Sequence, residues 1–247
     1  MFTEKKIKFT SNLGKTGKQF LPLPVSSKKS IPDWFKQMAS FHEKKFDQPT
    51  VKKCMPFLDA LSMGYIIKTG WDFLLKKSDT DKGWRMEMAF HKGVGPYLAE
   101  RSIGIEHHQV HQYPKEGFNK DEIHVVLKLL SPWVITTPPG YSCLFVNPFN
   151  HLRPHFRVLE GVVDTDTYTM PVNFPMIPKK FEEDQKIIPA GTPIGMVIPF
   201  KRDPWKMDVA FEETSPDEIG FATKTLVAFK RIYDNYKTKF WVKKNFD

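Results

Sequence analysis

The sequence predicts a mainly β protein, built as a barrel or sandwich of short strands. Apolar side chains alternate with other residues along 83–91 (GWRMEMAFH), which is the two-residue period of a strand with one buried face. Proline and glycine interrupt the other apolar runs at short intervals, as turns between short strands do. No regular alternation of strands and helices is visible, so a parallel sheet with crossover helices is not expected.

Further strands are predicted on both sides of this segment. Residues 64–75 (GYIIKTGWDFLL) are rich in β-forming residues and turn at a Thr-Gly pair near their middle. Residues 123–148 give two or three strands separated by proline-containing turns, and 192–202 (TPIGMVIPFKR) give another. These strands define a predicted β core over residues 51–210.

Residues 1–50 are predicted to form an irregular, proline-rich arm. Prolines at positions 22, 24 and 32 break helices and central strands, and Trp34 and Phe35 are expected to anchor the extended chain by their rings. The segment GKTGK at 14–18 lacks the glycine that a phosphate-binding loop needs five residues before Gly-Lys-Thr, because this position is Phe9. We therefore expect a flexible basic turn there.

The last segment, 211–247, is predicted to carry an amphipathic helix. Ser215 is a typical N-cap, with proline at the first helical position and Glu218 at the third. Such a helix, of about six turns, either packs on the β core or contacts a helix of another subunit. All three segments are expected to form one structural domain. The apolar positions that follow at three- and four-residue spacing are Ile219, Ala222, Leu226, Phe229, Tyr233, Tyr236 and Phe240.

Charge and composition limit the classes of protein. The 247 residues carry a net charge of +9, which favours anionic partners such as a nucleotide or another anionic small molecule. The lysines are scattered in pairs, however, and a lysine-rich solvated surface is the favoured interpretation. Only Cys54 and Cys143 are present, which indicates a reducing, cytoplasmic environment, and Cys143 is expected to be buried and inert. No apolar run reaches membrane-spanning length, so no membrane association is expected.

Two carboxylates at the end of a predicted strand form the main candidate site. Asp164 and Asp166 lie two residues apart in GVVDTDTY, and alternate residues of a strand point to the same face. Such a pair could bind a hydroxyl, a water or a cation. Because Thr-Asp-Thr is also prone to turn, the carboxylates could instead accept hydrogen bonds from backbone N–H groups. We expect the pair to face a concavity with Tyr141 or His155 nearby.

The order of three motifs resembles that of the dUTPase and dCTP deaminase family. The motifs are TTPPGYSCLFVNPFN (136–150), GVVDTDTY and IIPAGTPIGMVIPFKR (187–202), and the resemblance covers 133–200, with a weaker echo of the first family strand at 58–73. It implies a β-clip-like (dUTPase-like) core and a homo-oligomer with pockets between subunits. It also implies that Asp164 activates a water as general base and that Tyr168 stacks beneath a sugar.

The chain departs from the family pattern at the phosphate site. Asn147-Pro148-Phe149 stands where the family has Pro-Arg-Ser, and a glycine-rich C-terminal lid is absent. Tyr168 comes one residue late, which on a strand moves a side chain to the opposite face. We therefore expect a non-catalytic binding or structural protein on a β-clip scaffold. The alternative is a nucleotide-processing hydrolase or deaminase-like enzyme that uses Asp164 as general base.

More of the chain is similar to an uncharacterised family of tailed-phage and bacterial proteins. The similar segments are IPDWFK, KKCMPFLDALSMGYII and SPWVITTPPGYSCLF. This similarity implies a phage protein in the host cytoplasm or the virion, with another phage protein as a partner. It implies no activity.

Histidines form two further clusters. His151, Arg153 and His155 alternate on one predicted strand face, so they form either a basic patch beside the Asp pair or an exposed loop. His107 and His111 are spaced to share a helix face, but Pro114 would end that helix early, and His108 would point elsewhere. No metal or cofactor is predicted, and Arg153, His155, Tyr141, Tyr168 and Asp166 are the expected ligand-binding residues.

Overall fold

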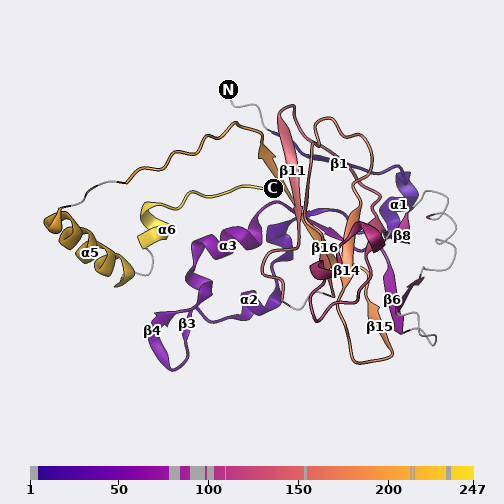
Figure 1. The fold of residues 1–247 in the computed structure, drawn as a ribbon, viewed down its shortest axis with the longest axis horizontal. Helices are drawn as coiled ribbons and strands as arrows, with labels where there is room; N and C mark the ends of the chain where they lie inside the picture. The colour runs from indigo at the N-terminus through magenta and orange to yellow at the C-terminus, as the bar shows by residue number, and fades with distance from the viewer. Residues whose placement is uncertain are drawn as a thin grey trace. The chain divides into compact units, whose positions relative to one another are not determined.

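The computed structural model describes residues 5–77, 84–89, 98, 103–108, 110–152, 155–211, 213, 215–231 and 235–247. The fold is mainly β, with antiparallel strand pairs throughout (Figure 1), as the sequence predicted. The chain forms two compact units, Met1–Ser30 with Gly64–Arg202 and Ile31–Met63 with Asp203–Asp247. The division predicted from the sequence, into segments 1–50, 51–210 and 211–247 of one structural domain, stays a prediction.

A five-stranded antiparallel sheet forms the centre of the first unit. Five consecutive residues of β16, from Ile194 to Ile198, are buried, which is expected of a central strand covered on both faces. The strands lie in the order β13 (Gly161–Val163), β11 (Tyr141–Val146), β16 (Pro193–Lys201), β5 (Tyr65–Lys68) and β2 (Val25–Ser26).

A four-stranded sheet packs against this central sheet. The ring of Phe145 on β11 meets the ring of Phe174 on β14 edge to face, with centroids 5.8 Å apart. Gly195 lies beside the same ring, and a Cβ atom there would come within 2.7 Å of Phe174. The two sheets therefore approach closely because this position has no side chain. The strands lie in the order β12 (Phe156–Val158), β14 (Phe174–Pro178), β9 (Leu127–Leu130) and β8 (Gly104–His107).

Two smaller sheets are also described in the first unit. In the three-stranded one, Phe73 and Leu75 of β6 alternate with more exposed residues and are buried, as a strand with one core face requires. In the two-stranded one, β1 (Lys8–Thr10) pairs with β10 (Val134–Thr136). The three-stranded sheet has the order β15 (Gln185–Ile188), β6 (Asp72–Lys77) and β7 (Trp84–Ala89).

The N-terminal residues of the first unit are more regular than predicted. The expected flexible basic turn at 14–18 lies within helix α1 (Gly14–Phe20). Leu13 before the helix and Leu21 after it are 1% and 7% exposed, so burial at both ends holds the segment in a helix despite its two glycines. A short 3₁₀ turn, η1 (Ser27–Ser30), follows β2.

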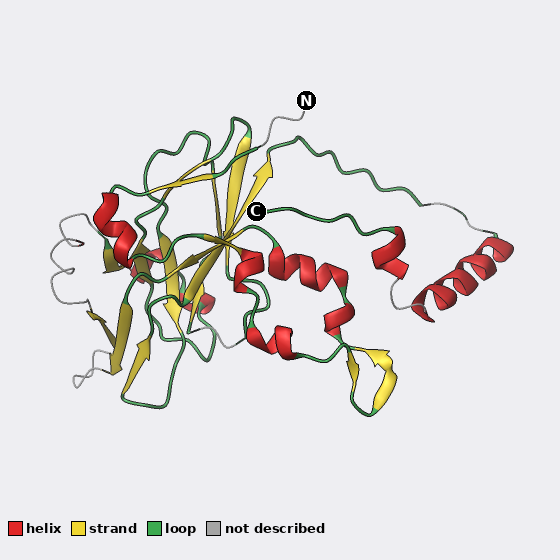
Figure 2. Cartoon of the chain, turned by 180° about the vertical axis from the view of Figure 1, so that it is seen from behind, coloured by secondary structure: helices red, strands yellow, loops and turns green. Residues whose placement is uncertain are grey.

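Most of the regular structure described in the second unit is helical (Figure 2). Phe35 is 3% exposed and stacks on Phe57 at 5.7 Å, so this ring is buried as expected. The indole N–H of Trp241 donates to both carboxylate oxygens of Asp59, at 2.9 and 3.1 Å, and fastens the C-terminal residues to α3. The elements are α2 (Asp33–Gln37), β3 (Phe41–His42), β4 (Lys45–Pro49), η2 (Val51–Lys53), α3 (Met55–Ser62), α5 (Pro216–Arg231) and α6 (Asn235–Lys239).

Two helices of this unit differ from the expectation. Residues 58–62, read as an echo of a first strand, belong to α3, where a proline in the first turn favours a helix. At α5, Ser215 and Glu218 form the reciprocal capping hydrogen bonds, at 2.9 and 3.3 Å. The structure has α5 and α6 where one helix was predicted, and residues 232–234 lie outside the described residues.

Within the described residues, no helix has the length and apolar character needed to span a membrane.

Candidate functional site

Asp164 follows directly after strand β13, where the chain turns. Its carbonyl oxygen accepts the N–H groups of Thr167 and Tyr168, at 3.1 and 2.9 Å, which closes the turn. Its carboxylate is 63% exposed, and Oδ1 accepts hydrogen bonds from Ser142 Oγ at 2.6 Å and from Arg202 at 3.3 Å. Among the residues that the structure describes, the Asp164 carboxylate is therefore bound to side chains and not to backbone N–H groups.

Asp166 is the buried member of the pair, with a side chain that is 6% exposed. The guanidinium of Arg202 binds both carboxylate oxygens, and the N–H of Gly140 donates to Oδ2 at 2.8 Å. These hydrogen bonds, with that from Arg202 the largest cause, lower the pKa of Asp166 from 3.8 to about 2. Asp166 thus acts as the turn-binding carboxylate that the sequence suggested as an alternative.

Arg202 was not identified from the sequence, although it organises the whole site. It follows directly after β16, its own N–H donates to the Gly140 carbonyl at 2.9 Å, and its side chain also donates to the Tyr141 carbonyl and to Ser142 Oγ. Asp166 is the main cause that raises the pKa of Arg202. We call Gly140, Ser142, Asp164, Asp166 and Arg202 the arginine clasp, which ties the ends of β11, β13 and β16 together.

A buried polar layer lies beside the clasp. Thr165, between the two aspartates, is 1% exposed, and its hydroxyl lies 2.7 Å from that of Thr137 and 3.3 Å from the sulfur of Cys143. Cys143 is fully buried, as predicted, and burial is the main cause that raises the pKa of its thiol. A raised thiol pKa and a fully buried sulfur do not suit a nucleophile.

The other predicted site residues lie in different places. Tyr141 is the first residue of β11, beside the clasp, and Nζ of Lys5 lies 4.9 Å from the centroid of its ring. Tyr168 lines a cavity of about 440 Å³, whereas His155 lines another of about 200 Å³. Arg153 lies outside the described residues. Neither aspartate lines either of these two cavities. The clasp thus brings Asp164 and Asp166 together beside Tyr141, whereas the rings of Tyr168 and His155 line cavities that the aspartates do not reach.

The Tyr168 cavity combines an apolar wall with a few polar groups. Tyr168 and Met170 are 43% and 60% exposed there, and Lys128 forms an ion pair with Glu106 at 3.0 Å. Asn173 accepts the N–H of Ser131 at 3.0 Å through its Oδ1. The lining residues are Asn12, Ile103, Glu106, Lys128, Leu130, Ser131, Pro132, Tyr168, Met170, Pro171 and Asn173.

The second cavity contains two histidines beside Asn147 and Thr192. Burial is the main cause that lowers the pKa of His151 and of His155, and the charge of Lys186 lowers that of His155 further. Nε2 of His151 is buried and, within the described part of the chain, has no hydrogen-bond partner. Burial therefore favours the neutral form of both rings, and the predicted basic patch of His151, Arg153 and His155 stays a prediction.

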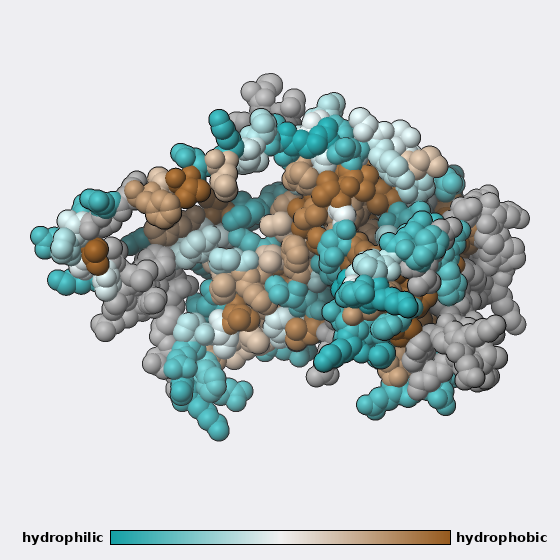
Figure 3. Space-filling view, in the orientation of Figure 1, coloured by the Kyte–Doolittle hydropathy of each residue, from teal (hydrophilic) through white to brown (hydrophobic). Residues whose placement is uncertain are grey.

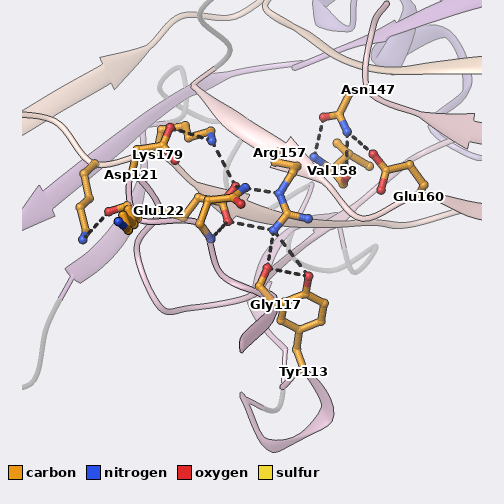
Figure 4. Close-up of polar contacts among 12 residues, drawn as sticks. Tyr113, Gly117, Asp121, Glu122, Asn147, Arg157, Val158, Glu160 and Lys179 are labelled. Atoms are coloured by element: carbon orange, nitrogen blue, oxygen red, sulfur yellow. Dashed lines mark hydrogen bonds and ion pairs between the residues drawn. The ribbon is translucent and has the colours of Figure 1, made fainter. Parts of the chain in front are cut away.

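A buried ion cluster, also missed by sequence reasoning, lies around Glu122 (Figure 4). Its fully buried carboxylate binds Arg157 through two hydrogen bonds of 2.7 and 2.8 Å and Lys179 at 3.2 Å. Asn119 donates two more hydrogen bonds to it. The bonds from Arg157 are the main cause that holds the pKa of Glu122 well below its usual range, while Glu122 raises that of Arg157. Every charge in the cluster is paired, as a structural ion cluster requires.

The same close-up shows how Asn147, which stands where the resembled family has its phosphate motif, uses its side-chain amide. Its amide donates to the Val158 carbonyl at 2.9 Å and to the Glu160 carboxylate at 2.6 Å, and its oxygen accepts the N–H of Val158 at 2.8 Å (Figure 4). The amide is therefore fully used within the protein. The Glu160 carboxylate would also repel a phosphate at this position.

The histidines at 107–111 do not share a helix. His107 ends strand β8, His108 follows it, and His111 lies in a 3₁₀ turn, η3 (Val110–Gln112). Over the residues that the structure describes, no group of three or more His, Cys, Asp or Glu side chains is placed to hold a metal ion.

Comparison with known proteins adds no relative, because no family model, no curated protein and no solved structure matches the chain.

Proposed function

We infer that the protein is a non-catalytic binding protein on a β-clip-like scaffold. The observation that carries this proposal is the pairing of both aspartates with Arg202. A general base needs an accessible oxygen and a pKa near the working pH. Asp166 is buried with a pKa of about 2, and Asp164 shares one of its oxygens with Ser142 and Arg202. The pair is suited to joining strands.

The strand order supports the scaffold part of the proposal. The three motifs of the family resemblance form β11, the β13 strand with its aspartates, and β16, and these three strands are neighbours in one antiparallel sheet. The arginine clasp joins their ends. Asn147 stands in place of the phosphate motif, and its side-chain amide is hydrogen-bonded to Val158 within the protein. This supports a protein that keeps the scaffold of the family and has lost its reaction.

The proposed ligand site is the Tyr168 cavity. Its volume of about 440 Å³ lies in the range of small-molecule sites, about 300–1,000 Å³. An exposed tyrosine ring offers a stacking surface, and the paired charges of Lys128 and Glu106 offer no net charge to a phosphate. A nucleoside or a similar flat, uncharged molecule therefore suits the cavity better than a triphosphate.

A thermal-shift screen with nucleosides and nucleotides tests this proposal, because a ligand that binds the folded state raises the melting temperature. We expect a nucleoside to raise the Tm of the wild type and to lose this effect in Tyr168→Ala. Tyr236→Ala is the matched control, since Tyr236 has a similar exposure, 39%, and does not line the cavity. Equal shifts in the three proteins, or none in the wild type, would contradict the proposed site.

An enzyme that uses Asp164 remains the second candidate, on one observation. The carboxylate is 63% exposed, and within the described residues its Oδ2 atom makes no hydrogen bond. One oxygen is therefore accessible to a water or a substrate hydroxyl.

The assignment of the protein to a phage, which the sequence similarity implied, also stays a prediction.

A further inference from the structure

The chain exposes a row of large apolar side chains directly after the arginine clasp. Trp205, Met207, Val209 and Phe211 are 92%, 88%, 63% and 96% exposed. Figure 1 shows this stretch as a long trace between β16 and α5, and Figure 3 shows brown and tan atoms gathered along it. We call residues 203–211 the arm. Rows of exposed apolar side chains of this size mark interaction surfaces.

The arm has the pattern of a strand that lacks a partner strand. Its apolar residues recur at every second position, so an extended backbone would place all four on one face. Within the described part of the chain, residues 204–211 make no backbone hydrogen bond. A segment with unpaired N–H and C=O groups and one apolar face is ready to pair with a sheet edge.

The charge of this region identifies the kind of partner. Residues 203–218 contain six acidic residues and one lysine, a net charge of −5, which leaves +14 on the rest of the +9 chain. The arm itself carries Asp203, Lys206 and Asp208, a net charge of −1, and residues 212–218 directly after it add −4. This acidic segment is attracted to a basic surface, and the remainder of this protein is such a surface. A second copy of the chain therefore complements the arm.

The open sheet edges are not equivalent as receiving sites. β1 pairs only with β10 among the described strands. It begins at Lys8, and Lys5 and Lys6 precede it, so this edge is basic and complements the acidic segment that contains the arm. β13 is also an edge, but Glu160 and Asp164 flank it and would repel the arm.

We propose that the arm of one chain pairs as an added strand with β1 of a second copy, and that the two copies exchange arms. Two fully buried aromatic rings remove about 150–250 Å² each from water. With Met207, Val209 and the receiving surface counted, one arm buries about 1,000 Å², and two arms bury about 2,000 Å², the size of a stable interface. Reciprocal exchange closes the assembly as a twofold dimer.

Sedimentation and light scattering of the full chain test the assembly. The wild type is expected at twice its 28.7 kDa mass, and Phe211→Glu is expected to return to 28.7 kDa with an unchanged circular dichroism spectrum. Leu23→Glu, which places the same charge on an apolar residue that is 51% exposed outside the arm, should stay dimeric. A wild type that is monomeric at high concentration, or a Phe211→Glu dimer as stable as the wild type, would overturn the proposal.

A photo-crosslinking amino acid at position 207, in a mixture of heavy- and light-isotope chains, tests the receiving strand. We expect crosslinks between position 207 of one label and residues 5–10 of the other. Crosslinks confined to chains of the same label would show that the arm folds back on its own chain, and crosslinks to another surface of the second copy would exclude β1. Either result rejects the proposed exchange.

Discussion

Arg202 determines what the two aspartates can do. It binds both carboxylate oxygens of Asp166, which lowers the pKa of Asp166, and it binds one oxygen of Asp164, which keeps a single accessible oxygen. Two aspartates, two positions apart in the sequence, thus have different roles because their surroundings differ. Asp166 stabilises the turn, and only Asp164 retains the exposure that chemistry would need.

Asp164→Asn separates the two functional candidates. In a binding protein, loss of this exposed pair should lower the free energy of unfolding by only about 0.2–1 kcal/mol, because solvent screens it. In an enzyme, the same variant would lose turnover of a nucleotide substrate. Urea unfolding and a nucleotide turnover screen on one preparation of the variant and of the wild type give both readouts. Turnover in the wild type that disappears in Asp164→Asn would replace the binding proposal by the enzyme proposal.

At the scale of elements, the fold depends on close contact between two sheets. β16 lies at the centre of one sheet, and its Gly195 faces the Phe174 ring of the other. Phe174 in turn meets Phe145, so one position without a side chain sets the spacing of an aromatic pair. The clasp then fixes the ends of the same strands.

Gly195→Ala should destabilise the protein by about 1–3 kcal/mol, because the new Cβ atom would overlap the Phe174 ring and force the sheets apart. The matched control is Gly161→Ala in β13, where a Cβ atom would meet no atom within 4 Å. Thermal or urea unfolding of both variants measures the difference. Equal stability of the two variants would show that the sheets adjust without cost.

The strands could be predicted because their signals are local. Alternating side chains and proline-glycine turns lie within a few residues of one another, and β5, β6, β9, β10, β11 and β16 follow them. Arg202 could not be predicted, because it meets Asp166 across 36 residues of sequence. Helix α1 was missed for a related reason, since its local sequence is a poor helix former and the burial of Leu13 and Leu21 holds it.

At the scale of the whole molecule, the buried Glu122 cluster makes the free energy of unfolding depend on pH. Arg157 is the main cause that lowers the pKa of Glu122 below its ordinary 4.5, so folding favours the ionised carboxylate. This contribution is complete above pH 4.5, the ordinary pKa, and is lost as the pH falls through the lower pKa of the folded state. The cluster joins β12, the turn before residue 122 and the end of β14, so its loss affects the first unit as a whole.

Glu122→Gln should lower the free energy of unfolding at pH 7 by about 3–5 kcal/mol, because it leaves Arg157 without its counter-charge. The difference from the wild type should narrow as the pH falls below 4.5, where the unfolded glutamate binds a proton. Urea unfolding between pH 7 and pH 3 measures both effects. Glu106→Gln, at an exposed ion pair, is the control, and a constant difference across this pH range would contradict the assignment.

The position of Arg202 also has a mechanical consequence. It is the last residue before the arm, so tension along the arm reaches its backbone and its ion pairs before it reaches β16. Behind it, β16 pairs antiparallel with β11 over six residues, from Lys201 to Met196. A load in the strand direction would shear these hydrogen bonds together and not peel them one at a time. In the proposed exchange, the clasp and β16 would therefore carry any force that the second copy exerts on the arm.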